Sequence, residues 1–321
     1  MNQLKFSDLG LADPIQLALK TRNHDTPTPI QQEAIPELLK GSDVLGIAQT
    51  GTGKTGAFAL PILHKLSKNQ PKDKRREPRA LILAPTRELA IQIGEEIAAY
   101  GQNLQLRHTV IFGGVKQNPQ VNALRRGIDI IVATPGRLLD LMSQGFIDLN
   151  GCAFLVLDEA DRMLDMGFVH DVRKIVSALP NKRQSLLFSA TMPKEIARLS
   201  GDMLNNPVRI EVTPQATPIE SITQNIYHVG AADKTKLLSS IMDDPSLSKV
   251  IVFTRTKHRA NRVADKLGKS GVDAEAIHGN KSQGARQRAL SRFRAGEARV
   301  LVATDIAARG IDGDGVTHVI N

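Results

Sequence analysis

The sequence predicts an α/β fold with two tandem domains, each a parallel sheet with helices on its faces. Apolar runs of strand length alternate with helical runs from residue 44 to residue 303, which is typical of parallel sheets covered by helices. The chain has 321 residues, more than one ordinary core accommodates. A polar, proline-containing stretch at residues 213–218 interrupts the alternation. We therefore expect domains at residues 1–208 and 222–321, joined by a linker at residues 209–221.

The composition indicates a protein that does not span a membrane and that has a polyanionic partner. Hydrophobic residues make up 41% of the chain, and their longest runs have only the length of a strand, so no segment can cross a bilayer. The net charge of +9 favours a nucleic acid as partner. The first residues lack the apolar core of a signal peptide and Cys152 is the only cysteine, so we expect a cytoplasmic protein without internal disulfides.

The first 43 residues form a helical segment that a proline turn interrupts. Pro27 and Pro29 fix an extended turn, and Gln31 follows it. The amide of Gln31 can both donate and accept hydrogen bonds, which recognition of an adenine edge requires. The alternative is that this glutamine only starts a helix.

A glycine-rich turn after the first strand is the motif around which the chain is organised. Residues 44–47 form a short apolar strand, residues 48–55 have the sequence AQTGTGKT, and a helix is predicted for residues 56–66. A strand, a glycine-rich turn and a helix in this order bind phosphate through backbone N–H groups. Lys54 supplies a cation for the terminal phosphates, and the Thr55 hydroxyl can bind Mg²⁺. We expect a nucleoside triphosphate to contact Gln49, Thr50, Gly51, Thr52, Gly53, Lys54 and Thr55.

Three loops that follow strands carry residues suited to a phosphodiester backbone. Strands are predicted at residues 81–84, 107–111 and 128–133, with helices at residues 88–100 and 117–126 between them. Such folds bind ligands at the carboxyl ends of parallel strands, and hydroxyl, arginine and bare backbone groups suit phosphodiester contacts. The alternative is that proline and glycine merely end the strands and that the arginines are solvated. The candidate residues are Pro85, Arg87, Gly114, Thr134 and Arg137.

Consecutive acidic residues follow the next buried strand, predicted at residues 154–157. Asp158, Glu159 and Asp161 lie directly after this strand, a pattern suited to Mg²⁺ chemistry beside a phosphate-binding loop. We expect Asp158 to hold the metal through water and Glu159 to orient and deprotonate the attacking water. The alternative is an acidic helix start, since Asp and Glu favour the first turn of a helix.

Two further segments of the first domain carry weaker signals. Ser189 and Thr191 follow a strand predicted at residues 185–188, and their small hydroxyls can sense a phosphate or a carboxylate. The basic, proline-containing run at residues 65–79 is predicted to be a solvated loop, with a direct contact to nucleic acid as the alternative. A helix at residues 194–203 and a strand at residues 208–212 complete the domain.

The alternation restarts after the linker without a second phosphate-binding loop. Strands are predicted at residues 222–229, 250–253, 274–277 and 300–303, and helices at residues 234–242, 258–270 and 283–293. The ends of these strands carry other polar residues, among them Thr304. Two α/β domains with one nucleotide loop suggest a cleft that closes over nucleotide and a second ligand.

These motifs, taken in order, resemble those of the DEAD-box ATP-dependent RNA helicases. The resemblance covers essentially the whole chain and is strongest to bacterial members with a short N-terminal extension. It implies two RecA-like domains, Mg²⁺-ATP bound between them and single-stranded RNA lying across both. The shared motifs are PTPIQ (residues 27–31), AQTGTGKT (48–55), PTRELA (85–90), GG (113–114), TPGR (134–137), DEAD (158–161), SAT (189–191), Gln283 with Arg286, and ATDIAARGID (303–312).

The resemblance also implies roles for individual residues. Gln31 is expected to recognise adenine, with Phe6 as the aromatic residue upstream of the motif. Ser189 and Thr191 are expected to couple ATP to strand separation, as catalytic residues beside Lys54, Asp158 and Glu159. Arg87, Gly114, Thr134 and Arg137, with the neighbouring Pro85, are expected to contact the RNA backbone, joined by Thr304, while Gly310 and Asp312 are expected to approach the ribose of ATP.

The chain departs from the family pattern at two places. Asn23 and His24 replace the usual glycine and aromatic residue before PTPIQ, so a ring is still expected to stack on adenine, but more weakly. The chain also stops at Asn321, before the HRxGRxGR motif that supplies the family's arginines to the γ-phosphate. We therefore expect a truncated form whose own catalysis is impaired.

The leading hypothesis is an enzyme that uses ATP to unwind RNA duplexes locally. An ATP-gated RNA clamp that holds a strand without efficient turnover is the alternative from a different class, and RNA-stimulated ATP hydrolysis separates the two. A DNA translocase is a further alternative, which competition by single-stranded DNA tests. Backbone contacts carry no sequence information, so neither a particular RNA nor any protein partner is predicted.

Overall fold

The computed structural model describes residues 4–69, 76–212, 222–308 and 315–321. The chain divides into two compact units, Met1–Ala216 and Thr217–Asn321, and this division falls inside the linker predicted at residues 209–221. Among the described residues, no helix is long and apolar enough to cross a membrane.

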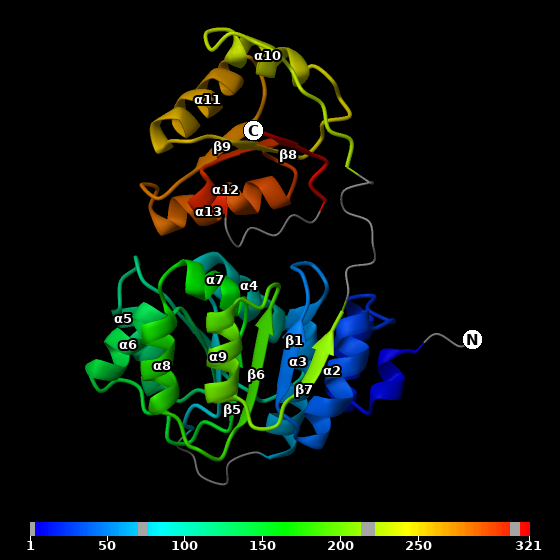
Figure 1. Cartoon of the computed structure of the whole chain (residues 1–321), viewed down its shortest axis with the longest axis vertical. Helices are drawn as coiled ribbons and strands as arrows, with labels where there is room; N and C mark the ends of the chain where they lie inside the picture. The colour runs from blue at the N-terminus through cyan, green and yellow to red at the C-terminus, as the bar shows by residue number, and fades with distance from the viewer. Residues whose placement is uncertain (1–3, 70–75, 213–221, 309–314) are drawn as a thin grey trace. The chain divides into compact units, whose positions relative to one another are not determined.

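The first unit contains a seven-stranded parallel sheet in the order β3-β4-β2-β5-β6-β1-β7 (Figure 1). All of the strands predicted for this domain are confirmed, with ends that differ by at most two residues. Because β7 pairs with β1, the sheet extends to Glu211, and the linker predicted from residue 209 begins too early. The strands are β1 (Val44–Ile47), β2 (Ala80–Leu83), β3 (His108–Ile111), β4 (Ile130–Ala133), β5 (Phe154–Leu157), β6 (Gln184–Ser189) and β7 (Val208–Glu211).

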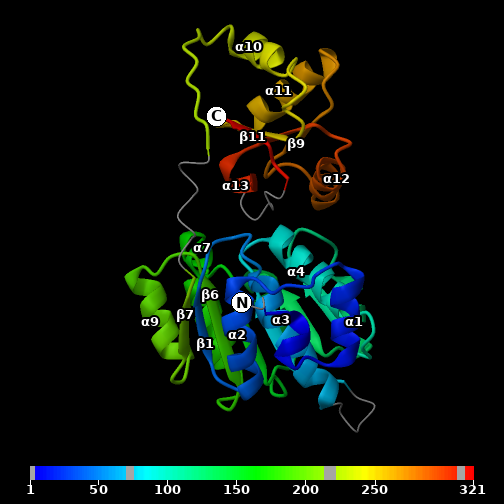
Figure 2. The same cartoon turned by 90° about the vertical axis from the view of Figure 1, so that its right-hand side faces the viewer.

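Helices cover both faces of this sheet, as Figures 1 and 2 show. Successive side chains of a strand point to opposite faces, so Val44 packs with the first layer of helices and Leu45 with the second. The first layer consists of η1 (Phe6–Leu9), α1 (Asp13–Thr21), α2 (Pro29–Lys40), α3 (Lys54–Lys68) and α4 (Arg87–Tyr100). The second consists of α5 (Asn118–Arg125), α6 (Pro135–Ser143), α7 (Ala160–Asp165), α8 (Val169–Ser177) and α9 (Lys194–Met203).

Two of the predicted loop motifs are the starts of helices. Helix α4 begins at Arg87, and the hydroxyl of its N-cap Thr86 accepts a backbone hydrogen bond of 3.2 Å from the first turn. Helix α6 begins at Pro135 with Thr134 as N-cap, so the TPGR motif is not the loop that was predicted. Helix α3 continues to Lys68, so the basic run from residue 65 starts in a helix rather than in a loop.

The second unit contains a four-stranded parallel sheet in the order β11-β8-β10-β9. Its strands are β8 (Val250–Phe253), β9 (Ala274–Ile277), β10 (Val300–Ala303) and β11 (His318–Ile320). Helices α10 (Lys234–Ile241) and α11 (Lys257–Lys269) pack on one face, and α12 (Gln283–Arg294) and α13 (Asp305–Ala308) pack on the other (Figures 1 and 2).

The strand predicted at residues 222–229 is wrong. This segment forms no strand, and the side chains of Ile222, Ile226 and Tyr227 are 60%, 85% and 60% exposed. The outer edge of β8 is paired with β11 instead, with Val319 opposite Ile251. A segment with β-forming residues becomes a strand only where a sheet supplies it with hydrogen-bond partners and a face to bury.

Candidate functional site

The phosphate-binding loop connects β1 to α3 and is anchored to the neighbouring strand β6. The N–H of Ala48 donates to the carbonyl oxygen of Ser189 at 3.0 Å. Gly51 and Gly53 have φ angles of +83° and +88°, in the region that favours glycine. A Cβ on Gly53 would also lie only 2.7 Å from Nε2 of Gln31. The loop therefore requires these glycines, and it presents backbone N–H groups at the start of α3, where anions bind.

Lys54 is the buried cation of this loop. The residue is 6% exposed, and its Nζ donates to the carbonyl oxygen of Ala48 at 2.9 Å. An ammonium group has three donors, so two remain for an anion such as a phosphate. The positive charge of Lys54 also lowers the pKa of the Asp158 carboxyl, against the larger effect of burial.

Gln31 connects helix α2 to the phosphate-binding loop. Its Oε1 accepts a hydrogen bond from the N–H of Thr28, and its Nε2 donates to the carbonyl oxygen of Gly53, both at 2.9 Å. The bond to Thr28 belongs to the capping box of α2, so Gln31 does take part in a helix start. Each end of the amide keeps capacity for one more hydrogen bond, and recognition of adenine stays a prediction.

Asp158 and Glu159 follow β5, and both are almost fully buried. Burial raises the pKa of Asp158 to about 6. Glu159 has a left-handed backbone, with φ of 52°, and its carboxylate accepts hydrogen bonds from Arg162 Nη1 at 2.7 Å and from the Thr50 hydroxyl at 3.3 Å. The acidic motif is thus in direct contact with the phosphate-binding loop. Helix α7 begins immediately after Glu159, so the acidic helix start is confirmed as well.

Asp161 connects the acidic motif to the end of β6. Its Oδ2 accepts hydrogen bonds from both the backbone N–H and the hydroxyl of Thr191, each 2.9 Å long. Its own N–H donates to the Ser189 hydroxyl at 3.2 Å, and that hydroxyl donates to the Thr191 carbonyl oxygen at 2.8 Å. The Thr191 hydroxyl therefore contacts a carboxylate, one of the two partners that the sequence suggested, whereas the Ser189 hydroxyl contacts backbone groups.

Thr55 and Asp158 are the predicted oxygen ligands of a metal ion. A hydroxyl and a carboxylate are hard ligands that fit Mg²⁺, which keeps several waters and binds through few protein groups plus phosphate. Within the described part of the chain, no group of three or more His, Cys, Asp or Glu residues could hold a metal. A hydroxyl and a carboxylate therefore fit a Mg²⁺ ion that enters with a nucleotide.

Three neighbouring strands bring the other loops of the first unit together. Because β3, β4 and β2 are adjacent and parallel, the residues after their carboxyl ends lie along one edge of the sheet. The guanidinium group of Arg87 lies against Gly114, where a Cβ would overlap it. Arg137 donates to the carbonyl oxygen of Val115 at 3.5 Å and pairs with Asp140 at 3.4 Å. Arg87, Gly114, Thr134 and Arg137 thus form one row, and Pro85 lies buried beside it.

Thr304 lies at the corresponding edge of the second sheet. It follows β10, and its N–H donates to the carbonyl oxygen of Ile277 at the end of β9 at 3.3 Å. The hydroxyl of Thr254, after β8, is close by and lies 3.4 Å from the carbonyl oxygen of Ala303. Gly310 and Asp312, which are expected near the ribose, lie outside the described residues.

The two aromatic candidates for adenine contact are both packed against the first unit. Phe6 is 5% exposed in the hydrophobic core, and its N–H donates to the carbonyl oxygen of Asp25 at 3.1 Å. The ring of His24 lies 6.3 Å from that of Tyr100, tilted by 55°. Their contacts with a nucleotide stay predictions.

Arg162 and Asp161 are site residues to which the sequence analysis assigned no role. Arg162 lies three residues after Glu159, a spacing that brings side chains together at the start of a helix. This spacing was a usable signal for the ion pair. The partner of Asp161 is 30 residues away in the sequence, so only the pairing of β5 with β6 brings the two together.

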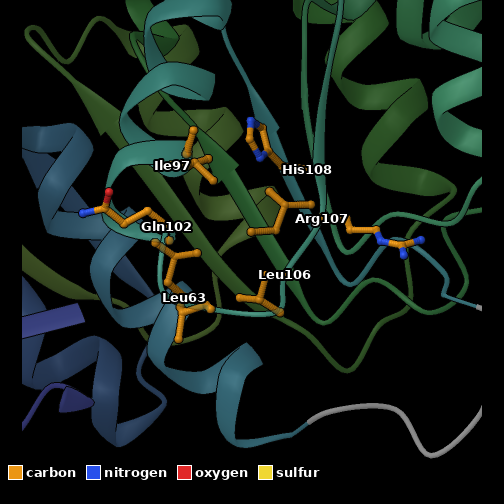
Figure 3. Close-up of a pocket in the computed structure, with 10 residues that line it drawn as sticks. Leu63, Ile97, Gln102, Leu106, Arg107 and His108 are labelled. Carbon is orange, nitrogen blue, oxygen red and sulfur yellow. The ribbon is translucent and has the colours of Figure 1, made fainter. Parts of the chain in front are cut away.

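A cavity of about 240 Å³ lies at the other end of the sheet, beside the amino ends of β3 and β4 (Figure 3). Its mixed lining includes His108, whose pKa is lowered by burial. None of the predicted site residues lines this cavity. The labelled lining residues are Leu63, Ile97, Gln102, Leu106, Arg107 and His108.

Two family models match this chain. The DEAD/DEAH box helicase model matches residues 28–199, and the helicase conserved C-terminal domain model matches residues 233–321. Each match lies within one of the two structural units.

Curated relatives and solved structures agree with these matches. The DEAD-box ATP-dependent RNA helicase CshA of Bacillus cereus is 42% identical over 98% of this chain and 59% of its own length. The ATP-dependent RNA helicase DeaD of Escherichia coli is 40% identical over 98% of this chain and 50% of its own length. The chain thus spans little more than half the length of these relatives. The structure of S. cerevisiae Dbp5 bound to RNA and ADP BeF3 is 32% identical, with a TM-score of 0.84 over 99% of this chain and 80% of that chain.

Proposed function

This chain belongs to the DEAD-box ATP-dependent RNA helicases, and from that premise we propose that it couples ATP binding and hydrolysis to local unwinding of RNA duplexes or remodelling of RNA–protein complexes in the cytoplasm. One observation carries the proposal. The DEAD motif touches the phosphate-binding loop at one end, where Thr50 donates to Glu159, and the end of β6 at the other, where Thr191 donates to Asp161, and the backbone at the start of α7 joins the two contacts. Occupation of the loop can therefore act on residues that have no contact with phosphate.

The nucleotide is held by the phosphate-binding loop in this proposal. Backbone N–H groups between Gln49 and Thr55 bind the phosphates, and the ammonium of Lys54 neutralises their charge. Gln31 recognises adenine, with His24 and Phe6 nearby, and Gly310 and Asp312 approach the ribose. Thr55 and Asp158 hold Mg²⁺ with the help of water, and the ion supplies charge stabilisation for the phosphates.

Glu159 is the general base in the proposed reaction. Its carboxylate is oriented by Arg162 at 2.7 Å and lies 3.3 Å from the Thr50 hydroxyl, so it is held against the phosphate-binding loop. A carboxylate at this place can orient a water and accept its proton as the water attacks the terminal phosphate.

Coupling passes through Asp161 in this proposal. Glu159 and Asp161 belong to one short turn, and Asp161 holds the backbone and hydroxyl of Thr191. A change in the position of Glu159 on nucleotide binding therefore shifts Asp161 and, with it, Ser189 and Thr191. We assign the link between ATP and strand separation to these contacts.

RNA is bound through its backbone along the carboxyl edges of the two sheets. The residues that we assign to this contact are Pro85, Arg87, Gly114, Thr134 and Arg137 in the first unit and Thr304 in the second. Because hydroxyl, guanidinium and backbone groups at these positions suit phosphate and sugar contacts, the binding does not depend on base sequence. In the similar solved structure of S. cerevisiae Dbp5, the bound ligands are RNA and ADP BeF3.

The test is ATP hydrolysis by this chain with and without single-stranded RNA. We expect RNA to stimulate hydrolysis, and we expect RNA to bind more tightly with a non-hydrolysable ATP analogue than with ADP, because coupling between two ligands is reciprocal. Equal affinities in the two nucleotide states would contradict coupling. Tight RNA binding without any turnover would favour the RNA clamp, and equal competition by single-stranded DNA would favour the translocase.

A further inference from the structure

Helix α11 of the second unit carries a row of exposed cations that the proposed function does not use. Its buried side, Ala260, Val263, Ala264 and Leu267, packs on the sheet. The exposed side carries Arg259, Arg262, Lys266 and Lys269, and we call these four residues the basic stripe. At about 100° per residue they fall within an arc of about 80°, and at about 1.5 Å per residue they extend over about 15 Å. The helix therefore presents four cations in a line.

The cations of the basic stripe have no anionic partners in the described part of the chain. None of their side chains makes an ion pair or hydrogen bond with another described residue. Three arginines of α12 differ, because Arg292 pairs with both Glu275 and Glu297 and because Arg286 and Arg294 also interact within the chain. What sets the basic stripe apart from these three arginines is that four cations without a described anionic partner follow one another along one side of a helix.

Repulsion among the cations of the basic stripe lowers the stability of helix α11. Arg259, Arg262, Lys266 and Lys269 form successive like-charge pairs three or four residues apart, which destabilise a helix. The first turn of α11 contains no acidic residue, although the positive end of the helix dipole favours one there. Asp265 is the single acidic residue of the helix and lies on the flank of the stripe. An anion bound along the stripe would remove this repulsion.

The position of α11 connects the stripe to the proposed RNA edge. The helix begins shortly after β8, near Thr254 at the end of that strand and Thr304 at the end of the neighbouring strand β10. It runs from the carboxyl edge of the sheet toward the amino edge. A polyanion bound at Thr304 can therefore continue along the outside of α11. The cations follow one another about every 5 Å along the helix. This distance is of the same order as the spacing of about 3.4 Å between successive phosphates of one strand, measured along the axis of a duplex.

We propose that the basic stripe is an accessory RNA-binding surface that holds the phosphates of RNA extending beyond the strand bound at the sheet edge. The inference rests on the proposed function for the identity of the polyanion as RNA. It assigns to α11 a sequence-independent contact with flanking single-stranded or duplex RNA. The stripe adds affinity for long RNA and contributes nothing to a strand that ends at the sheet edge.

The test variant carries Arg262→Gln and Lys266→Gln together, since glutamine keeps helix propensity and removes the charge. The matched control is Lys174→Gln with Lys182→Gln, two exposed cations of the first unit whose loss changes the net charge equally. Fluorescence anisotropy measures the affinity for a short single-stranded RNA and for the same strand extended by a hairpin duplex, over a range of salt concentrations.

For the extended RNA we expect the stripe variant to bind about tenfold more weakly and the salt slope to fall by about 2, since each phosphate contact contributes about 1. The control and the short strand should be unaffected within about twofold. Unchanged affinity of the stripe variant for the extended RNA would overturn the proposal, as would an equal loss in the control or on the short strand. Equal affinities of the unmutated chain for the short strand with a non-hydrolysable ATP analogue and with ADP would contradict the proposed function but not the stripe.

Discussion

The Asp161 carboxylate holds Thr191 twice, through the backbone N–H and through the hydroxyl, at 2.9 Å each. Replacing Thr191 by valine removes the hydroxyl bond and keeps the size of the side chain. A hydrogen bond to a charged group contributes about 1.5–3 kcal/mol, so we expect RNA unwinding to slow by about tenfold or more. ATP affinity should not change, because Thr191 has no assigned contact with the nucleotide. Thr191→Ser, which retains the hydroxyl, serves as the control in a duplex-separation assay, and equal rates in both variants would contradict the assignment.

Substitutions of Lys54 and Glu159 should impair different steps of the reaction with ATP. Lys54→Ala removes a buried cation and is expected to weaken ATP binding, whereas Glu159→Gln is expected to preserve binding and to lower hydrolysis by about a hundredfold or more. Equilibrium titration with a fluorescent ATP analogue and single-turnover hydrolysis separate the two effects. Lys68→Ala, at the exposed end of the same helix, is the control. If Glu159→Gln hydrolysed ATP at the rate of the unmutated chain, Glu159 would not be the general base.

Gln31 should affect both the strength and the selectivity of nucleotide binding. Its amide holds Thr28 and Gly53, so Gln31→Ala loosens the phosphate-binding loop and removes the group assigned to adenine. We expect ATP to bind about tenfold more weakly and the preference for ATP over GTP to decrease. The neighbouring Gln32→Ala, which loses only a bond to the Pro27 carbonyl oxygen, is the comparison. An unaltered ATP to GTP ratio would show that Gln31 acts on the loop alone.

Stability of the first unit should depend on the protonation of His64. Its Nδ1 accepts a hydrogen bond from the Ala12 N–H at 3.0 Å, and burial, followed by the charges of Lys68 and Lys65, lowers its pKa. Below about pH 6.5 the unfolded chain takes up this proton more readily than the folded chain, so stability falls as the pH decreases through the lowered native pKa. Urea unfolding at about pH 7 and about pH 5 should show a smaller loss in His64→Gln, which keeps an acceptor without a titrating group. Identical losses would mean that other groups carry the dependence.

Strand β1, which lies between β6 and the edge strand β7, tolerates no side chain at Gly46. A Cβ there would lie 2.5 Å from Cδ1 and Cε1 of the fully buried Phe188 ring. Gly46→Ala is therefore expected to lower the free energy of unfolding by about 1–3 kcal/mol, the usual effect of overpacking. Gly201→Ala, in α9 with open space around its Cβ, should instead raise it by up to about 1 kcal/mol. Thermal or denaturant unfolding of both variants checks the contrast.

The sequence predicted the elements whose signal is local. Strands such as β5 are continuous apolar runs because both faces of a parallel sheet are covered, and the phosphate-binding loop requires glycines that are visible in the sequence. The short helix α6 escaped prediction because it starts at Pro135, which also suits a loop, and the start of α7 after Glu159 was only the alternative to a metal site. Helix α8 was not predicted either. The segment at residues 222–229 has β-forming residues but no sheet edge, which only the pairing of β11 with β8 reveals.

The contacts of the candidate site could be predicted only in part for the same reason. Residues such as Lys54 and Asp158 were identified from their motifs, and Asp158 proves to be buried beside the loop. The bonds of Glu159 to Thr50 and of Asp161 to Thr191 join residues that are far apart in the sequence. They follow from the order of strands β5, β6 and β1, which no local pattern specifies.

The neighbours of β1 in the sheet determine when the phosphate-binding loop can form during synthesis. Val44 pairs with Leu186 on one side and with Val208 on the other, so both neighbours leave the ribosome long after β1. At about 5–20 residues per second the delay is on the order of ten seconds. During that time the nascent chain holds an apolar strand with both edges unpaired, and ATP cannot assist its folding. A translational pause before β7 has left the ribosome would lengthen this exposure, whereas a later pause would not.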